Sequence, residues 1–219
     1  MATHTVENYL KAMFALADES GNISSVELSH TLGVSKPTTN SMVKKLHEQG
    51  LVKYERYQPL RLTAAGRKAA ALIIRKHRLT EMFLVEKMGF GWEEVHGIAE
   101  QVEHVKSAAF FDRMDELMGH PHLDPHGSPI PDREGKVQHL NYERLSKRSV
   151  GERVILMALA ESSSELLEFL TRRGLVLGVE LEIVSKEDFD GSMTIQVGAE
   201  MQVLTATVSD CLLVESQGT

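Results

Sequence analysis

Cysteine is nearly absent from this chain, since Cys211 is the only one among 219 residues. A single thiol excludes an internal disulfide and is typical of a reducing compartment. Long apolar runs are missing too, because no stretch approaches the roughly 18 residues of a membrane span. The first residues, Met1 to Glu7, carry neither a basic nor an apolar segment, so no secretion signal is expected. These absences favour a cytoplasmic protein with no membrane partner.

Lysine and arginine are outnumbered by acidic residues, but the balance differs along the chain. The formal net charge of −7 would argue against a nucleic-acid partner if it were uniform. Residues 1–76, however, hold 11 lysines and arginines against 6 acidic residues, a net charge of +5, and the rest of the chain has a net charge of −12. We therefore expect a polyanion to bind the N-terminal third.

The N-terminal third has the pattern of a helix-turn-helix. Apolar residues at helical spacing predict helices over residues 5–18 and 26–32, and Gly33 predicts a turn after the second helix. Ser35 as an N-cap and Pro37 in the first turn predict a third helix that ends near Gly50. The second and third of these helices form the helix-turn-helix motif. The later helix of such a motif typically enters the major groove of DNA, and here it opens with small hydroxyl residues.

A hairpin is expected directly after this helix. Strands over residues 51–54 and 60–63 with a turn near Pro59 make the motif winged. A generic three-helix bundle with a polar surface is the alternative, but it explains neither the wing nor the local positive charge. The residues expected to contact DNA, with the two arginines on phosphates, are Ser35, Lys36, Pro37, Thr38, Thr39, Ser41, Lys44, Lys45, Arg56 and Arg61.

Histidines and carboxylates recur in the middle of the chain. If residues 92–118 form one helix, four of them fall within an arc of about 100°: His96, Glu100, Glu103 and His104. On the preceding helix, expected over residues 64–88, His77 and Glu81 lie one turn apart. A solvated polar face is the simpler interpretation of a single such helix. Two neighbouring helices with imidazoles and carboxylates instead favour a site for Mn²⁺, Fe²⁺ or Zn²⁺.

The same two helices carry many large apolar side chains, including Phe83, Phe110, Phe111 and Leu117. Two helices alone cannot easily bury all of them, so a partner subunit is expected. A twofold homodimer would also match the two halves of a palindromic operator.

The last third predicts a small β domain. Four of the six prolines lie between residues 121 and 131 and mark an irregular connector, in which His126 is expected to stabilise a turn rather than bind metal. Five short strands are expected over residues 153–160, 181–186, 193–197, 202–206 and 211–215, with a helix over 163–173. Ser162 and Glu165 are expected to cap this helix, and Cys211 is expected to be buried in the last strand. These elements fit a small SH3-like barrel.

Five segments stand in a fixed order over residues 5 to about 135: Glu7–Leu10, the winged motif, Arg75–Glu81, Val95–Val105 and Pro125–Pro131. Together they resemble, in the same order, the diphtheria toxin repressor family of metal-dependent transcriptional regulators. The tail also resembles the family's third domain. The resemblance implies a mainly α fold with a small β part: a winged helix-turn-helix domain (1–76), a helical metal-binding and dimerisation domain (77–140) and an SH3-like domain (141–219).

The resemblance also implies two metal sites per subunit. The primary, activating site would comprise Glu100, Glu103 and His104 with Asn8 from the first helix. Iron-type members have cysteine where this chain has Glu100. The ligand set here therefore contains a hard carboxylate oxygen in place of a soft thiolate sulfur. The manganese-transport-regulator branch has carboxylates at the positions of Asn8 and Lys11, and a protonated Lys11 argues against that branch's two-ion cluster.

An ancillary site would comprise His77, Glu81 and His96, as in iron-type repressors, although the manganese branch uses the equivalent of His77 in its cluster. Glu161 roughly matches a position from which the third domain can donate a further ligand. The expected ions are Mn²⁺ or Fe²⁺, with Zn²⁺ or Co²⁺ as substitutes in vitro.

These inferences predict a homodimeric repressor that binds operators of metal-uptake genes when Mn²⁺ or Fe²⁺ is plentiful. A metal that joins the first helix to the dimer domain would restrict their relative motion and favour the DNA-binding arrangement. One alternative is a winged-helix regulator that answers an organic ligand. Another is a metal hydrolase, which leaves the wing unexplained and has no evident general base. We expect neither an enzyme nor a small organic substrate.

Overall fold

The structure is a computed structural model in which residues 3–216 are described. The chain divides into two compact units. The first comprises residues 1–80, 99–122 and 130–138, and the second comprises residues 81–98, 123–129 and 139–219. Within residues 3–216, no helix combines the length and the apolar character that crossing a membrane requires.

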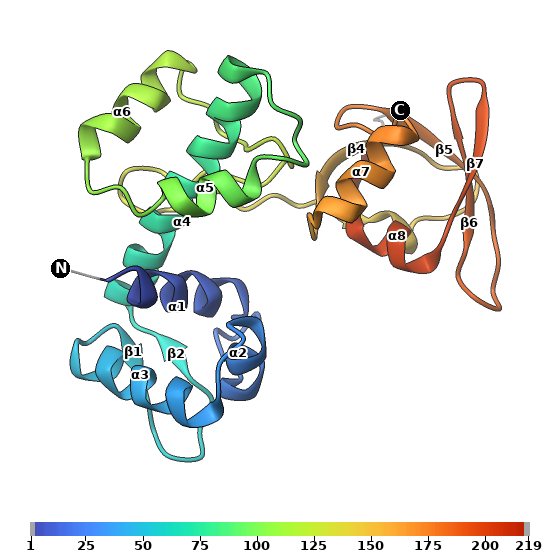
Figure 1. Cartoon of the computed structure of the whole chain (residues 1–219). Coiled ribbons are helices and arrows are strands. Elements are labelled where there is room, and N and C mark those ends of the chain that lie inside the picture. Colours follow the sequence, from blue (N-terminus) through green and yellow to red (C-terminus); the bar gives the residue numbers. More distant parts are fainter. Residues whose placement is uncertain (1–2, 217–219) are drawn as a thin grey trace. The chain divides into compact units, whose positions relative to one another are not determined.

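The first unit begins with three short helices and a hairpin (Figure 1). The helices are α1 (His4–Ala15), α2 (Ser25–Thr31) and α3 (Lys36–Glu48), and the antiparallel strands are β1 (Val52–Lys53) and β2 (Arg61–Leu62). The side chains of Thr3, Ser24 and Ser35 accept backbone N–H groups at the starts of the three helices. The predicted winged helix-turn-helix is therefore confirmed.

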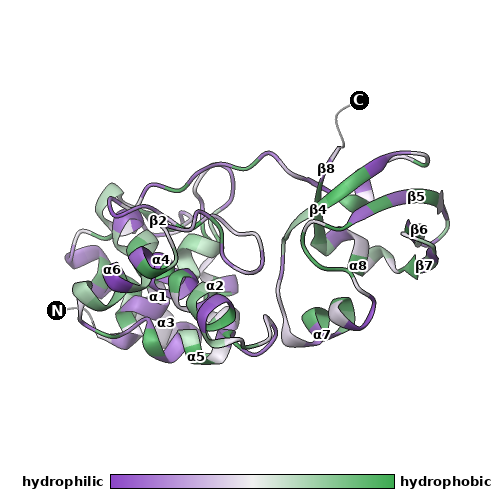
Figure 2. Cartoon of the chain, turned by 90° about the horizontal axis from the view of Figure 1, so that it is seen from above, coloured by the Kyte–Doolittle hydropathy of each residue, from purple (hydrophilic) through white to green (hydrophobic). Residues whose placement is uncertain are grey.

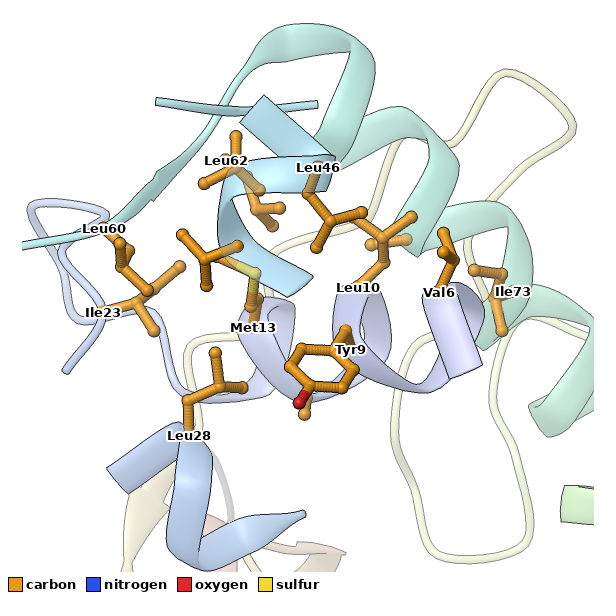
Figure 3. Close-up of a cluster of buried hydrophobic side chains, with 14 residues drawn as sticks. Val6, Tyr9, Leu10, Met13, Ile23, Leu28, Leu46, Leu60, Leu62 and Ile73 are labelled. Carbon is orange, nitrogen blue, oxygen red and sulfur yellow. The ribbon is translucent and has the colours of Figure 1, made fainter. Parts of the chain in front are cut away.

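One apolar core holds these elements together. Leu10 and Met13 of α1 and Leu46 of α3 are at most 1% exposed. Figure 3 shows side chains of α1, α2, α3, the hairpin and α4 (Ala64–Met88) gathered in this core. Because α1 and α3 share this core, a displacement of α1 is transmitted to α3.

The expected single helix over residues 92–118 is wrong. The chain forms α5 (His96–Val102) and α6 (Ala108–Leu117), with a break between them. Ser107 has an extended backbone and its side chain accepts the N–H of Phe110, so it starts a new helix and cannot continue the old one. Glu103 and His104 consequently lie in the break, and the argument from a single helical arc does not apply to them.

The β domain belongs to the second unit. Six strands pair antiparallel in the order β3-β8-β4-β5-β6-β7, and Figure 1 labels β4, β5, β6 and β7. Hydrophilic and hydrophobic residues are interleaved along several of these elements (Figure 2), as expected for elements with one buried face. The bounds are β3 (Glu143–Arg144), β4 (Arg153–Leu159), β5 (Glu180–Lys186), β6 (Met193–Val197), β7 (Glu200–Leu204) and β8 (Leu212–Ser216), with the 3₁₀ turn η1 (Leu145–Lys147) and the helices α7 (Ser164–Arg172) and α8 (Ala206–Cys211).

The five predicted strands and the predicted helix are confirmed, but two local expectations are wrong. The cap of α7 is Ser163, which accepts the N–H of Leu166, and not Ser162. Cys211 ends α8 and is half-buried rather than lying inside a strand, because Thr205 caps an additional helix there. Burial, followed by the charges of Glu161 and Asp210, raises the pKa of the Cys211 thiol.

Candidate metal centre and DNA interface

A fully buried carboxylate, Glu103, is the centre of a polar cluster in the first unit. Its side chain is 0% exposed. Lys11 Nζ lies 2.9 Å from Glu103 Oε1, and His77 Nδ1 lies 2.6 Å from Glu103 Oε2. Lys11 also pairs with Glu100 at 3.4 Å. We call the following residues the Glu103 cluster: Glu7, Lys11, His77, Glu100, Glu103 and His104.

Glu103 is ionised despite its burial. Burial by itself would raise the pKa of this carboxyl. Hydrogen bonds from His77 and Lys11, together with their positive charge, outweigh burial and hold the pKa below its usual value of 4.5. The cluster therefore contains a negative charge that requires a cation beside it.

His104 is oriented as a metal-binding histidine requires. Its Nδ1 lies 2.6 Å from Glu7 Oε2, and its Nε2 lies 3.8 Å from Glu103 Oε1. In the neutral ring that binds a metal, Nδ1–H donates to the Glu7 carboxylate and the lone pair of Nε2 is on the side of Glu103. The ring also stacks on His4 with centroids 4.2 Å apart.

The donor set fits a divalent metal ion. Carboxylate oxygens and an imidazole nitrogen are ligands for Mn²⁺, Fe²⁺ and Zn²⁺. The ammonium of Lys11 lies against both Glu100 and Glu103, where a cation compensates their charge. An entering metal ion would have to displace this ammonium.

The structure brings together most, but not all, of the expected primary ligands. Glu103 and His104 lie in the cluster and Glu100 joins it through Lys11, whereas Asn8 is exposed. The first helix instead contributes Glu7 and Lys11. Their spacing of four residues was a signal in the sequence, but it is equally typical of an exposed ion pair.

Glu81 belongs to the second unit and has partners there. It is 3% exposed, and its Oε1 lies 3.2 Å from Nδ1 of the exposed His96. His77 precedes Glu81 by one turn of α4. Glu161 is exposed ahead of α7, and its charge acts on Cys211.

Two buried residues of the connector also lie near Glu81. Ligand atoms of Glu81, Asp124 and His126 all lie within 4.8 Å of one another. Asp124 was not recognised from the sequence. His126 was expected only to stabilise a turn, and its ring in fact reaches Trp92 O with Nε2 at 2.9 Å.

The residues of α3 and its cap that were predicted to contact DNA are exposed, with one exception. Thr39 is 0% exposed and its hydroxyl donates to Ser35 O, so it belongs to the core and not to the interface. Its position three residues before Met42 and four before Val43 places it on the apolar face. The other predicted residues on this helix and its cap are exposed: Ser35, Lys36, Pro37, Thr38, Ser41, Lys44 and Lys45.

The two arginines of the wing are exposed as well. Arg61 Nε donates to Asn22 Oδ1 at 2.8 Å, so its position is fixed by the loop between α1 and α2. Arg56 lies 4.9 Å from the ring centroid of Tyr57. Both side chains can reach a polyanion without breaking the core.

A winged helix beside a buried carboxylate–histidine cluster defines a class of metal-responsive DNA-binding proteins, and comparisons with known proteins agree. Residues 1–60 match the family model described as iron dependent repressor, N-terminal DNA binding domain. Residues 63–132 match iron dependent repressor, metal binding and dimerisation domain. Residues 143–216 match the FeoA domain, which corresponds to the β domain.

Curated relatives match different shares of the chain. The iron-dependent repressor IdeR of Mycobacterium leprae is 35% identical over 127 residues, which cover 58% of this chain and 55% of that protein. The chain thus matches about half the length of this relative. The diphtheria toxin repressor of Corynebacterium glutamicum is 27% identical over 197 residues, 84% of this chain and 85% of the relative.

Solved structures match nearly the whole chain. A manganese-dependent transcriptional repressor in complex with manganese superposes with a TM-score of 0.88 at 30% identity, covering 97% of this chain and 100% of the other. ScaR with bound Zn²⁺ gives a TM-score of 0.81 at 30% identity, covering 96% and 98%. The chain belongs to the diphtheria toxin repressor family of iron- and manganese-dependent repressors. Members of this family are repressors and not enzymes.

Proposed function

We propose that this protein is a metal-dependent transcriptional repressor that binds palindromic operator DNA as a homodimer in the cytoplasm. The metal would be Mn²⁺ or Fe²⁺, and the regulated genes would encode metal uptake. The matches to DNA-binding and to metal-binding and dimerisation domains support this proposal.

The observation that carries the proposal is the dual role of α1. Its residues Glu7 and Lys11 contact His104 and Glu103 in the metal cluster. Its residues Leu10 and Met13 pack in the core that also holds α3. An ion that displaces Lys11 changes the contacts of α1, and the shared core transmits this change to the recognition helix. Metal would thus shift the population of DNA-binding conformations.

Glu100 favours manganese as the physiological ion. It provides an oxygen ligand where a thiolate would favour Fe²⁺, Co²⁺ and Zn²⁺. Intrinsic affinity still follows the Irving–Williams order, so Zn²⁺ binds more tightly in vitro and selection in the cell rests on geometry and availability. The change Glu100→Cys should move activation towards Fe²⁺ and Co²⁺.

His77, Glu81 and His96 remain the proposed ancillary site. The close contact of Glu81 with His96, and the position of His77 one turn before Glu81, support it. Asn8 is proposed as a further ligand of the primary site and Glu161 as a further ligand of the ancillary site. Both side chains are exposed, so each would have to move to its metal ion. Asn8→Asp should then tighten Mn²⁺ binding.

Operator binding with and without metal tests the function. Fluorescence anisotropy of labelled operator DNA should show binding at micromolar Mn²⁺ and none in EDTA. Glu103→Gln should abolish the metal response, at least a hundredfold in apparent affinity, because the central carboxylate is lost. Glu86→Gln, which changes an exposed carboxylate of α4, is the matched control and should bind as wild type. Binding that ignores metal would favour the alternative of a regulator that answers an organic ligand.

Lys11 tests the competition between the ammonium and the metal. Lys11→Met should lower the Mn²⁺ concentration for half-activation about tenfold, which corresponds to ~1.4 kcal/mol. Lys76→Met is the control, because Lys76 Nζ contacts the backbone carbonyls of Glu103 and Val105 rather than carboxylates. An unchanged Mn²⁺ requirement in Lys11→Met would remove Lys11 from the mechanism.

On the DNA side, Lys44, Lys45, Arg56 and Arg61 should act through phosphates. Changing one of them to alanine should reduce the salt dependence of binding by about 1 in slope and leave site preference intact. The double change Thr38→Ala and Ser41→Ala should instead alter site preference. Unchanged preference would contradict the assignment of α3 as the recognition helix.

A further inference from the structure

We propose that Trp92 is a positioning residue for the Glu103 cluster, because it anchors the loop before α5 on the β domain. This inference rests on the proposed metal response of that cluster. The loop, residues 89–95, connects α4 to α5, and α5 carries Glu100. Neither Trp92 nor α7 has a part in the repressor mechanism proposed above.

Trp92 attaches the loop to α7. Its Nε1–H donates to Thr171 Oγ1 at 2.8 Å, and its half-buried ring packs against the apolar core of the β domain. The next residue, Glu93, accepts a hydrogen bond from Ser164 Oγ through its carbonyl oxygen, at 3.4 Å. Ser164 and Thr171 are about two turns apart on α7, so the loop is held near both ends of this helix.

The loop is itself ordered by hydrogen bonds. Phe90 N donates to Leu84 O at 3.1 Å and thereby closes the end of α4. Glu94 N donates to Gly91 O at 3.1 Å, and Gly91 N donates to Glu94 Oε2 at 2.9 Å. Trp92 lies inside this turn. Its attachment to α7 therefore fixes the whole turn and not only one side chain.

The helix that follows the turn, α5, belongs to both units. His96–Ile98 lie in the second unit, whereas Ala99–Val102 lie in the first. Glu100 lies in the part that belongs to the first unit, and its carboxylate pairs with Lys11 at 3.4 Å. Because a helix is a stiff element, the place where α5 starts affects the position of the Glu100 carboxylate.

The attachment lowers the cost of binding a metal ion. A loop that is already ordered loses less conformational entropy when Glu100 becomes a ligand. The apparent dissociation constant equals the intrinsic constant divided by the fraction of molecules in the binding-competent conformation. Thr171 is exposed, so the hydrogen bond to it is a modest one. Its loss should reduce the competent fraction about threefold.

Direct measurement of Mn²⁺ binding tests the role of Trp92 without DNA. Free Mn²⁺ is followed by electron paramagnetic resonance in titrations of the full-length protein, and Glu103→Gln identifies the binding step that belongs to the cluster. Trp92→Phe keeps an aromatic ring without the N–H donor, and Thr171→Val removes the acceptor at nearly constant volume. Each should raise the dissociation constant of that step about threefold, and the double variant should raise it no further. Thr194→Val, the same change at a half-exposed threonine of β6, should bind as wild type.

Two further comparisons separate positioning from a general loss of stability. Thr171→Ser keeps the hydroxyl acceptor and should restore wild-type affinity. The number of Mn²⁺ ions bound per chain at saturation should be the same in wild type and in the Trp92 and Thr171 variants, because positioning changes the affinity and not the number of sites. A lower number in Trp92→Phe and Thr171→Val would show a structural role and overturn the inference.

The same titrations distinguish this inference from the proposed function. Wild type that binds Mn²⁺, together with unchanged affinity in Trp92→Phe and Thr171→Val, would overturn the inference and leave the metal-dependent repressor intact. Wild type that binds no Mn²⁺ would overturn the proposed metal centre and this inference with it.

Discussion

Two loops of this protein have the same local structure but different surroundings. In residues 18–22, Asp18 Oδ1 accepts the N–H groups of Ser20 and Asn22, while Gly21 N donates to Asp18 O. In residues 124–128, Asp124, His126 and Ser128 make the equivalent bonds, with Gly127 in the place of Gly21. The first loop is largely exposed, whereas Asp124 and His126 are buried.

The comparison separates what a loop does locally from what its surroundings add. Both loops contain Asp-x-x-Gly, and both glycines have positive φ, +76° for Gly21 and +84° for Gly127. In the exposed loop the carboxylate only holds a turn. In the buried loop it also lies beside Glu81 and the ring of His126. Burial therefore places the carboxylate of this turn beside other ionisable side chains.

The largest effect should come from adding a methyl group at the two glycines. Gly127→Ala places a Cβ on the backbone of Met157 and Ala158, so either the loop or β4 must move. We expect a loss of at least about 3 kcal/mol in the free energy of unfolding. The Cβ atom added by Gly21→Ala meets no atom within 4 Å. The loss in the free energy of unfolding should then come only from the positive φ, about 1 kcal/mol.

Chemical unfolding measures this difference. Trp92, the only tryptophan of the chain, belongs to the second unit and reports on Gly127 by its fluorescence, while circular dichroism follows the helices around Gly21. Equal losses in the two variants would mean that the contact of Gly127 with β4 contributes nothing.

Removing the carboxylates should have the next largest effect. In EDTA, Asp124→Ala leaves the N–H groups of His126 and Ser128 without their acceptor in a buried loop, which costs about 2–3 kcal/mol. Asp18→Ala should cost less, because water replaces the lost acceptor. The exposed Asp132, whose Oδ1 accepts the N–H groups of Glu134 and Lys136, should behave like Asp18. A smaller loss at Asp124 than at Asp18 would contradict the role of burial.

The smallest expected effect is the contribution of Asp18 to stability at low pH. The backbone N–H of Asn22 is the main reason why the pKa of Asp18 lies below 3.8. Since the folded pKa is the lower one, the stabilisation is complete above the unfolded pKa and is lost as the pH falls through the folded pKa. Asp18→Asn keeps the acceptor but cannot titrate, so its unfolding midpoint should fall less than that of wild type between pH 5 and pH 2. Parallel curves would show that Asp18 does not contribute.

Much of the fold followed from local patterns. The caps and the glycine turn around α3, the helical pattern of the 25-residue α4 and the short strand segments of the last third each predicted an element that the structure contains. The break at Ser107 was missed because an apolar periodicity continues across it. Thr39 was assigned to the DNA surface because residue type alone does not tell which face of a helix is buried.

The candidate metal centre was predicted less completely. Residue chemistry and family resemblance singled out Glu103 and His104, but Lys11 and Glu7 contact them from 92 and 97 residues away in the chain. No local pattern shows that an ammonium lies against a buried carboxylate. The direction of the Glu103 pKa shift also depends on this distant contact.

The sequence by itself determined the elements and the loops, because helix caps, periodicity and Asp-x-x-Gly turns are set by residues a few positions apart. It thereby determined that the loops at Asp18 and Asp124 would be alike. Only the tertiary structure decided that one loop stays in water and the other places Asp124 and His126 beside Glu81. The reason is physical: removal from water changes the free energy of a charge far more than any local turn does, and burial is a property of the whole packed unit.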